Sequence, residues 1–238
     1  MMTPERYVET LRQQPAIPLR SAILYGSAAA GDHAGAGSDY NLLLILNSVD
    51  RRVLDALLKP TRGWLRSGNP PPLLFTREQL ARSADVFPIE LLDMLDSHRI
   101  LFGEDILAGL AVGTEHLRLQ VEHELKGKLI QLRKQYLAVG TRSSAVVALV
   151  VESYSSVATL LRAALRLFSK TVPASKIEAV RALSQHLAIP VEVFETIERL
   201  KRNRTARRHA DGPSLFDPYV AAIEAAVNAV DAFVRGKN

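Results

Sequence analysis

The sequence predicts an α/β domain over residues 1–110, followed by an all-helical domain over residues 111–238. Three observations support this division. Short apolar runs alternate with segments of helical spacing in the first part, which is typical of α/β folds. Long amphipathic segments without a strand pattern fill the second part. The charge also changes there: the first part has 11 Lys/Arg and 13 Asp/Glu, and the second has 19 and 12.

In the first part, capping residues and apolar runs define the elements. Thr3 and Thr76 suit the N-cap position of helices. The run over 40–46 is almost continuously apolar, which predicts a strand covered on both faces. Residues 87–93 fit either a strand or a helix that begins at Pro88. The remaining pattern predicts helices over 3–14, 50–67 and from 76, and strands over 21–25, 40–46, 73–75 and 99–102.

The second part predicts a helical bundle. Apolar residues recur at helical spacing in every long segment, and no internal repeat or low-complexity tract interrupts them. Ser214 is expected to be the N-cap of the last helix. The predicted helices span residues 114–137, 144–168, 175–187, 190–200 and 214–234.

Composition narrows the class of protein. The 238 residues are 47% hydrophobic and 23% charged, which is ordinary for a folded soluble chain. Cysteine is absent, which excludes disulfides and thiolate zinc sites and favours a reducing compartment. Residues 1–7 lack the pattern of a signal peptide, and apolar runs such as 42–46 are too short to cross a bilayer. We therefore expect a cytoplasmic protein that has no membrane partner.

Two neighbouring strands carry the most informative chemistry. The first ends in Gly26-Ser27, a turn whose backbone N–H groups and hydroxyl can bind phosphate oxygens. The second begins with Asp39 and Asn41, which share a strand face because they are two residues apart. Mg²⁺ binds one or two carboxylates together with substrate phosphates. The pattern therefore predicts a phosphate turn beside a metal site, with Ser38 placed to cap or orient Asp39.

The segments 24–27 and 38–44, joined by a Gly-rich link, resemble the signature of the polymerase-beta-type nucleotidyltransferase superfamily. That signature is Gly-Ser, a gap of about ten residues, and Asp-x-Asp or Asp-x-Glu opening an apolar strand. An α/β domain with a mixed sheet, followed by a helical domain, also resembles small bacterial members such as aminoglycoside nucleotidyltransferases. The resemblance implies Mg²⁺-dependent transfer of a nucleotide monophosphate from a nucleoside triphosphate to a hydroxyl acceptor.

The resemblance also assigns roles to residues. Gly26 and Ser27 match the turn that binds the triphosphate, and Asp39 matches the first metal carboxylate. The family's third carboxylate lies on a later strand, for which Glu90 is the candidate and Asp93 the reserve. If residues 87–93 are a helix instead, Glu90 is an ordinary first-turn acid favoured by the helix dipole.

Asn41 departs from the family pattern because it stands where a second carboxylate is expected. An amide oxygen can bind Mg²⁺ but carries no charge, so a site for two divalent ions is weakened. Three hypotheses remain open: a weakened or one-metal transferase, a nucleotide-binding pseudoenzyme, and an active enzyme with an unusual ligand set. The acceptor is equally open, and a small molecule, a protein hydroxyl or an RNA end would each suit.

The segment Arg199–His209 holds seven Lys, Arg and His residues. It could bind the phosphates of a nucleotide or RNA, or its cations could simply complement the C-terminal end of a helix. Arg204 and His209 have the Arg-x4-His spacing of HEPN-type ribonucleases, which the segment resembles in this respect alone. That resemblance implies metal-independent RNA cleavage as a lesser alternative.

Overall fold

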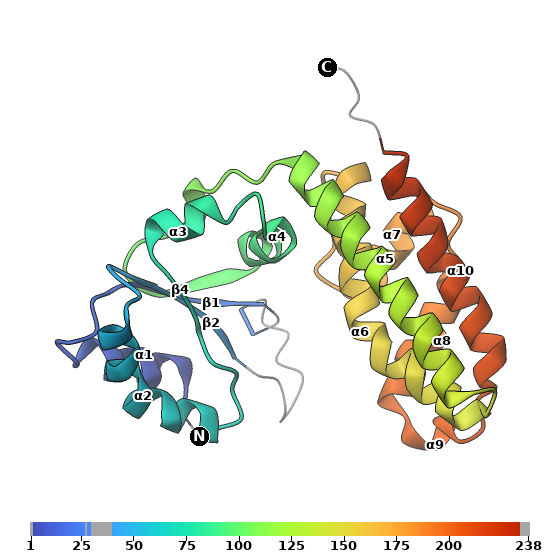
Figure 1. Cartoon of the computed structure of the whole chain (residues 1–238), viewed down its shortest axis with the longest axis horizontal. Coiled ribbons are helices and arrows are strands. Elements are labelled where there is room, and N and C mark those ends of the chain that lie inside the picture. The colour runs from blue at the N-terminus through green and yellow to red at the C-terminus, as the bar shows by residue number, and fades with distance from the viewer. Residues whose placement is uncertain (1, 27, 30–39, 234–238) are drawn as a thin grey trace. The chain divides into compact units, whose positions relative to one another are not determined.

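The computed structural model describes residues 2–26, 28–29 and 40–233. The chain divides into two compact units, Met1–Gly113 and Thr114–Asn238 (Figure 1). The sequence predicts a change of domain near residue 110, close to this division. Each unit is built around its own core, and the two are described separately.

The N-terminal unit contains a four-stranded mixed sheet in the order β3-β2-β1-β4. β1 is antiparallel to both β2 and β4, whereas β2 and β3 run parallel. The elements in chain order are α1 (Pro4–Arg12), β1 (Leu19–Tyr25), β2 (Asn41–Leu46), α2 (Arg51–Arg66), β3 (Leu73–Phe75), α3 (Arg77–Arg82), α4 (Pro88–Asp96), β4 (His98–Phe102) and the 3₁₀ turn η1 (Leu107–Gly109).

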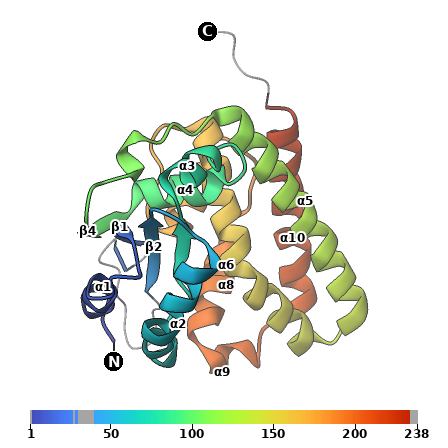
Figure 2. The ribbon, with the colours of Figure 1, turned by 60° about the vertical axis from the view of Figure 1, so that its left-hand side comes forward.

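Helices cover the sheet on both faces, with α1 and α2 on one side and α3 and α4 on the other (Figure 2). The side chains of β2 alternate between these two layers. Leu42 and Leu44 pack into the cluster formed with α1 and α2, and Leu43 and Ile45 into the cluster formed with α3 and α4. All four are at most 1% exposed, so the prediction of a strand covered on both faces is confirmed.

The helix starts follow from capping residues. The Thr3 hydroxyl accepts a hydrogen bond from the Arg6 amide, and Thr76 forms a capping box with Gln79. The ambiguous segment 87–93 belongs to helix α4, so its interpretation as a strand is wrong. Pro88 occupies the first turn of α4. Backbone N–H groups in a first turn have no acceptor within the helix, so the lack of an N–H in proline costs no hydrogen bond there. Apolar side chains then follow at helical spacing and face the sheet.

Trp64 joins the two helices on one face of the sheet. Its side chain is fully buried and stacks on the ring of Tyr7 from α1, with 4.9 Å between centroids. The indole Nε1 donates a hydrogen bond to the Pro70 carbonyl at 2.6 Å. The Trp64 ring is therefore packed and its N–H has a hydrogen-bond acceptor. Through this side chain α2 packs against both α1 and the strands.

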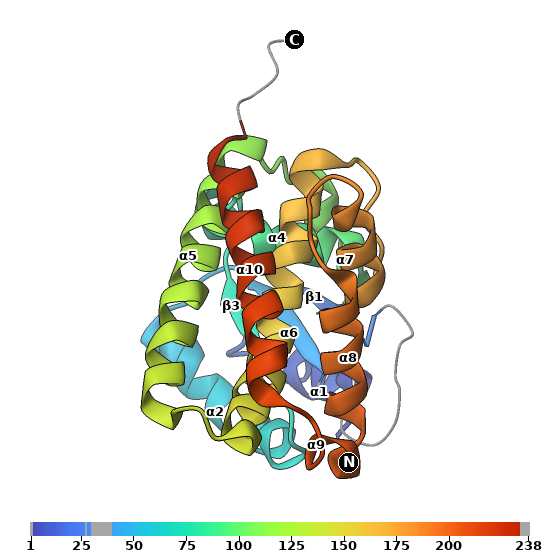
Figure 3. The same ribbon diagram turned by 90° about the vertical axis from the view of Figure 1, so that its right-hand side faces the viewer.

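Over residues 114–233, the C-terminal unit consists of helices and the loops that join them (Figure 3). The central helix is α6, which packs against α5, α7, α8 and α10. A short helix, α9, was not predicted from the sequence. The bounds are α5 (Thr114–Val139), α6 (Ser143–Phe168), α7 (Lys176–Ser184), α8 (Val191–Arg202), α9 (Arg204–Arg207) and α10 (Gly212–Asp231).

α10 begins at Gly212 with Asp211 as its N-cap, so the expectation that Ser214 is the cap is wrong. The Ser214 hydroxyl donates to the Asp211 carboxylate instead. Contact with α6 fixes this start: the Gly212 amide donates to the Ser143 hydroxyl at 2.7 Å. A Cβ at Gly212 would lie 2.5 Å from the Ser143 carbonyl oxygen, so only glycine allows this close contact with α6. α10 therefore begins two residues before Ser214.

α6 is long and apolar enough, by length and composition alone, to cross a membrane, and no other helix in the described ranges meets that test. The core helix of a bundle meets it equally well. Of its most apolar window, 56% is buried within the structure, which fits its central place among four other helices.

Gly103 allows β4 to end close against β1. Ser21 of β1 is fully buried, and its hydroxyl lies 3.1 Å from the Phe102 carbonyl oxygen and 2.8 Å from that of Glu104. Between those carbonyls Gly103 has φ +77°, and a Cβ there would lie 2.0 Å from the Arg20 carbonyl oxygen. No side chain fits at this point without displacing β1.

We expect Gly103→Ala to destabilise the N-terminal unit by about 3 kcal/mol, because left-handed strain of about 1–2 kcal/mol adds to overpacking of about 1–3 kcal/mol. Gly68→Ala is the matched control: its φ is +89°, yet nothing lies within 4 Å of an added Cβ. It should lose about 1 kcal/mol through strain alone. Urea unfolding followed by the fluorescence of Trp64, the single tryptophan, measures both. Equal losses would show that the close approach is unimportant.

Candidate active site

Gly26 directly follows β1, has φ +80°, and is held by Ser97, which lies between α4 and β4. Its amide donates to the Ser97 carbonyl at 3.1 Å, and the Ser97 hydroxyl donates to the Gly26 carbonyl at 3.3 Å. The Ala29 amide donates to the same carbonyl at 2.9 Å, closing a turn. The Gly26 amide therefore already has an acceptor, and the part of Gly26 in this turn that the structure describes is its left-handed backbone conformation.

Asn41 lies beside Gly26. It is the first residue of β2 and stands opposite Tyr25 in the antiparallel ladder. A Cβ placed on Gly26 would lie 3.5 Å from the Asn41 Nδ2 atom. The Asn41 side chain is half-buried. The structure therefore brings together two of the residues that the sequence predicts for the site, at the paired ends of β1 and β2.

Tyr25 and His98 continue this row across the sheet. His98, at the start of β4, stands opposite Tyr25 on the other side of β1, and directly opposite residues of paired strands point to the same face. Tyr25 packs against the α3 and α4 layer, which identifies that face. Burial raises the pKa of Tyr25 to about 12, so its phenol stays protonated at neutral pH.

His98 connects β4 to the segments on either side of it. Its Nδ1 lies 3.0 Å from the Met94 carbonyl oxygen of α4, and its Nε2 lies 3.2 Å from Asp105 Oδ2. The other oxygen of Asp105 accepts from the amides of Leu107 and Ala108 at 3.0 and 3.2 Å. His98 therefore has a structural role, because both of its ring nitrogens lie within hydrogen-bond distance of protein oxygens. Together with Ser97 it fixes the strand end that holds Gly26.

The Asp105 carboxyl has a lowered pKa. Desolvation raises the pKa, but hydrogen bonds from His98 and from the backbone of Ala108 and Leu107, with the charge of His98, outweigh desolvation. The ionised form therefore stabilises the fold. This contribution is present above the unfolded-state pKa of 3.8 and is lost as the pH falls through the lower folded-state pKa.

The candidates for the third carboxylate, Glu90 and Asp93, lie on a helix, whereas the family pattern implies a position on a later strand. Glu90 lies in the first turn of α4 and is exposed, and Asp93 is half-buried on the same helix. Neither β3 nor β4 contains an acidic residue. Among the residues that the structure describes, no group of three His, Asp or Glu side chains could hold a metal ion. The predicted roles of Ser27, Ser38 and Asp39 fall outside the described residues.

The second predicted feature, the basic segment Arg199–His209, spans the end of α8, all of α9 and the turn that follows. Arg204 begins α9, and His209 lies beyond its end with its amide donating to the Ala206 carbonyl. No hydrogen bond within the described residues joins the side chains of Arg204 and His209. The ribonuclease hypothesis therefore stays a prediction.

The mixed sheet, its helical layers and the bundle that follows define an α/β nucleotidyltransferase-like domain joined to an all-α domain. A solved structure with this fold is spectinomycin adenyltransferase AAD(9) from Enterococcus faecialis, determined with ATP and spectinomycin. The two structures are similar with a TM-score of 0.56 at 12% sequence identity, over 94% of this chain and 97% of that one. No family model and no curated protein matches the sequence.

We expect Asp105→Asn to be about 1 kcal/mol less stable than the wild type at pH 7, because Asn keeps the backbone acceptor but loses the charged partner of His98. The difference should shrink once the pH falls below the unfolded-state pKa of 3.8 and disappear below the lower folded-state pKa, where the wild-type carboxyl is protonated. Urea unfolding across this pH range measures it. Asp55 forms a long ion pair with Arg51 on the surface, at 3.7 Å. The control Asp55→Asn should therefore leave the stability nearly unchanged at every pH. A pH-independent difference for Asp105→Asn would contradict the ionic explanation.

Proposed function

We propose that this protein is a nucleotidyltransferase that moves a nucleotide monophosphate from a nucleoside triphosphate to a hydroxyl acceptor. The observation that supports this most is the juxtaposition of Gly26 and Asn41 at the paired ends of β1 and β2. Ser27 and Asp39, which carry the phosphate-binding hydroxyl and the metal-binding carboxylate in the proposal, lie one and two residues away in the sequence.

In the proposed reaction, the acceptor oxygen forms a bond to the α-phosphorus while the bond from that phosphorus to the bridging oxygen breaks. Pyrophosphate leaves with the electron pair, and the acceptor proton passes to a base or to water. The protein binds the phosphates through the Ser27 hydroxyl and the backbone amides of Ser27 and Ala28. Mg²⁺, when bound with the nucleotide, would neutralise phosphate charge.

Asn41 decides how strong the site can be. Its half-buried side chain has no hydrogen-bond partner in the described part of the chain, so the amide is available to a ligand. Asp39 and Asn41 together would supply one charged and one neutral oxygen, a donor set that suits Mg²⁺ escorted by a triphosphate. Two metal ions need more negative charge than these two groups carry, so we propose a weakened, one-metal transferase.

The comparison with known structures supports the choice of donor. The similar adenyltransferase was solved with ATP and with a small molecule, spectinomycin. By analogy of fold, we propose a nucleoside triphosphate as donor and a hydroxyl-bearing small molecule as the first acceptor class to test. A protein hydroxyl or an RNA end fits the same chemistry and belongs in the same assay.

The second candidate function is nucleotide binding without transfer. The amide at Asn41 and the lack of acidic residues on β3 and β4 favour it. A pseudoenzyme would bind a triphosphate at the Gly26 turn yet release no pyrophosphate with any acceptor. Binding and turnover therefore have to be measured separately on the same protein.

We expect one of the four nucleoside triphosphates, with Mg²⁺, to bind in isothermal titration, and Asp39→Ala to abolish that binding. The carboxylate is the only charged metal ligand in the proposed pair, so its loss removes the cation that holds the phosphates. Asp55→Ala, which removes an exposed carboxylate from α2, is the control and should bind normally. If no triphosphate binds, or if Asp39→Ala binds as well as the wild type, the nucleotide site is wrong.

We also expect Asn41→Asp to raise pyrophosphate release at least tenfold, because it restores the second negative charge of the metal site. A coupled pyrophosphate assay with mixed acceptors measures this. Unchanged turnover, with nucleotide binding retained, would reject the idea that Asn41 limits catalysis. Absence of release from both the wild type and Asn41→Asp would favour the pseudoenzyme.

Glu90→Gln tests the remaining carboxylate. A group that binds metal or activates the acceptor contributes at least tenfold to turnover, whereas an exposed first-turn acid contributes nothing to it. The proposed catalytic role of Glu90 therefore requires a fall of at least tenfold in pyrophosphate release with the thermal stability unchanged. Turnover equal to that of the wild type would assign Glu90 to the surface of α4.

A further inference from the structure

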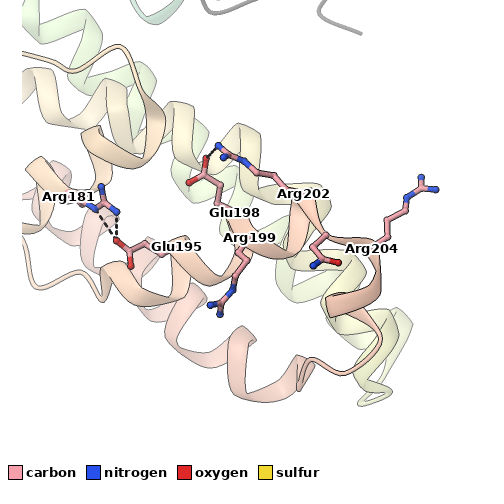
Figure 4. A pocket seen from close by; sticks show the side chains of 7 residues that line it. Arg181, Glu195, Glu198, Arg199, Arg202 and Arg204 are labelled. Atoms are coloured by element: carbon pink, nitrogen blue, oxygen red, sulfur yellow. Dashed lines mark hydrogen bonds and ion pairs between the residues drawn. The ribbon is translucent and has the colours of Figure 1, made fainter. Parts of the chain in front are cut away.

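An open hollow of about 600 Å³ lies on the C-terminal unit, where α7, α8 and the start of α9 meet (Figure 4). Charged side chains dominate its lining, and no aromatic side chain takes part. The residues that line it are Arg181, Glu195, Glu198, Arg199, Arg202, Asn203 and Arg204.

Two of the four arginines are neutralised by glutamates. Arg181 donates through Nε and Nη2 to Glu195 Oε1 at 2.9 and 2.6 Å, and through Nη1 to Glu178 at 2.5 Å. Arg202 donates to Glu198 at 2.8 Å. These ion pairs add little net charge to the hollow, but they orient two guanidinium groups.

Arg199 and Arg204 have no such partner. Neither side chain forms a hydrogen bond or ion pair within the described residues, and no dashed line reaches either one in Figure 4. Arg204 also stands at a fixed corner, because the Asn203 side chain accepts from the amides of Thr205 and Ala206 at 3.0 and 3.1 Å. The lining of the hollow therefore includes two uncompensated positive charges, on side chains that point in different directions in Figure 4, one of them at the hydrogen-bonded start of α9.

The other cations of the segment Arg199–His209 also fall into two groups, those with a hydrogen-bond partner and those without one in the described residues. Arg207 donates to the carbonyls of Leu200 and Lys201 at 2.6 and 2.7 Å, so it caps the end of α8 as the structural alternative expects. Lys201 is held by a hydrogen bond to α6. Arg208 and His209 are exposed and have no side-chain partner in the described ranges, so they extend the uncompensated positive surface next to α9.

We propose that this hollow binds the phosphate groups of a polynucleotide backbone. Arginine is suited to phosphate because its planar fork can donate two parallel hydrogen bonds. The unit around it has 19 Lys/Arg against 12 Asp/Glu over residues 114–238, which attracts a polyanion at long range. Without an aromatic lining, bases have no stacking platform. The contact is therefore to the backbone and independent of base sequence.

The proposal uses none of the residues of the proposed nucleotide site, because every residue that lines the hollow belongs to the C-terminal unit. It requires binding and no cleavage. It also makes a quantitative demand, since each single-strand phosphate contact contributes about −0.7 to the slope of log affinity against log salt concentration.

The test is fluorescence anisotropy with a labelled 20-nucleotide oligo-uridine RNA between about 50 and 200 mM salt, a range in which phosphate contacts dominate the salt dependence. Relative to the wild type, the double variant Arg199→Gln/Arg204→Gln should bind at least tenfold more weakly at the lower salt concentration. Its salt slope should be less steep by about 1.4, corresponding to two lost phosphate contacts. Both side chains lack partners, so the variant should retain the wild-type melting temperature.

Two further variants make the result specific. Lys134→Gln/Lys170→Gln removes the same charge from exposed positions of the same unit and should change affinity less than twofold. Glu198→Gln releases Arg202 and should tighten binding. The proposal is overturned if the wild type does not bind the RNA or if both double variants lose affinity equally. It is also overturned if the hollow binds pyrophosphate or ATP but not the RNA.

Discussion

Burial of β1 and β2 on both faces is the constraint on which the rest of the N-terminal unit depends. A strand between two helical layers can carry polar side chains only near its ends, because its middle has no contact with water. The one fully buried polar side chain within these strands, Ser21, confirms the rule since carbonyl oxygens of the β4 end surround its hydroxyl. The chemistry available to the sheet is therefore concentrated where β1 ends and β2 begins.

That end of the sheet is held together by residues that are far apart in the sequence. Gly26 exchanges hydrogen bonds with Ser97, 71 residues further along the chain, and His98 then ties β4 to α4 and to Asp105. A turn that binds phosphates has to be held in place before the ligand arrives, because ordering it during binding would reduce affinity. In the proposed nucleotide site, the contacts of Ser97 with Gly26 would provide this support from the side of β1 opposite Asn41.

Much of this architecture is predictable from the sequence, because it depends on local patterns. Capping threonines set helix starts, and the apolar run of β2 predicts a strand covered on both faces. The Ser97, His98 and Asp105 contacts had no such signal, since each depends on tertiary pairing. The segment containing Glu90 was ambiguous for a related reason: Pro88 and the apolar residues after it suit either a strand or a helix, and packing against the sheet selects the helix.

The basic segment shows the limit of reading charge from sequence. Seven cationic residues appear equivalent in the chain, yet Arg207 caps a helix and Arg202 pairs with Glu198, whereas Arg199 and Arg204 have no partner in the described structure. Only tertiary structure separates a structural cation from one that is available to a ligand. The same reasoning applies to Asn41, whose proposed role rests on its position beside Gly26 as well as on its residue type.

The central claim is that the end of β1 and the start of β2 form a nucleotide site. The most direct measurement is a titration of the ¹⁵N-labelled protein with Mg²⁺ and a non-hydrolysable nucleoside triphosphate, followed by amide NMR. The claim predicts saturable shifts at Gly26, Ala28, Ala29 and Asn41, with the amides of Arg199–His209 unchanged. Shifts confined to the C-terminal unit, with the amides at the end of β1 unmoved, would contradict it.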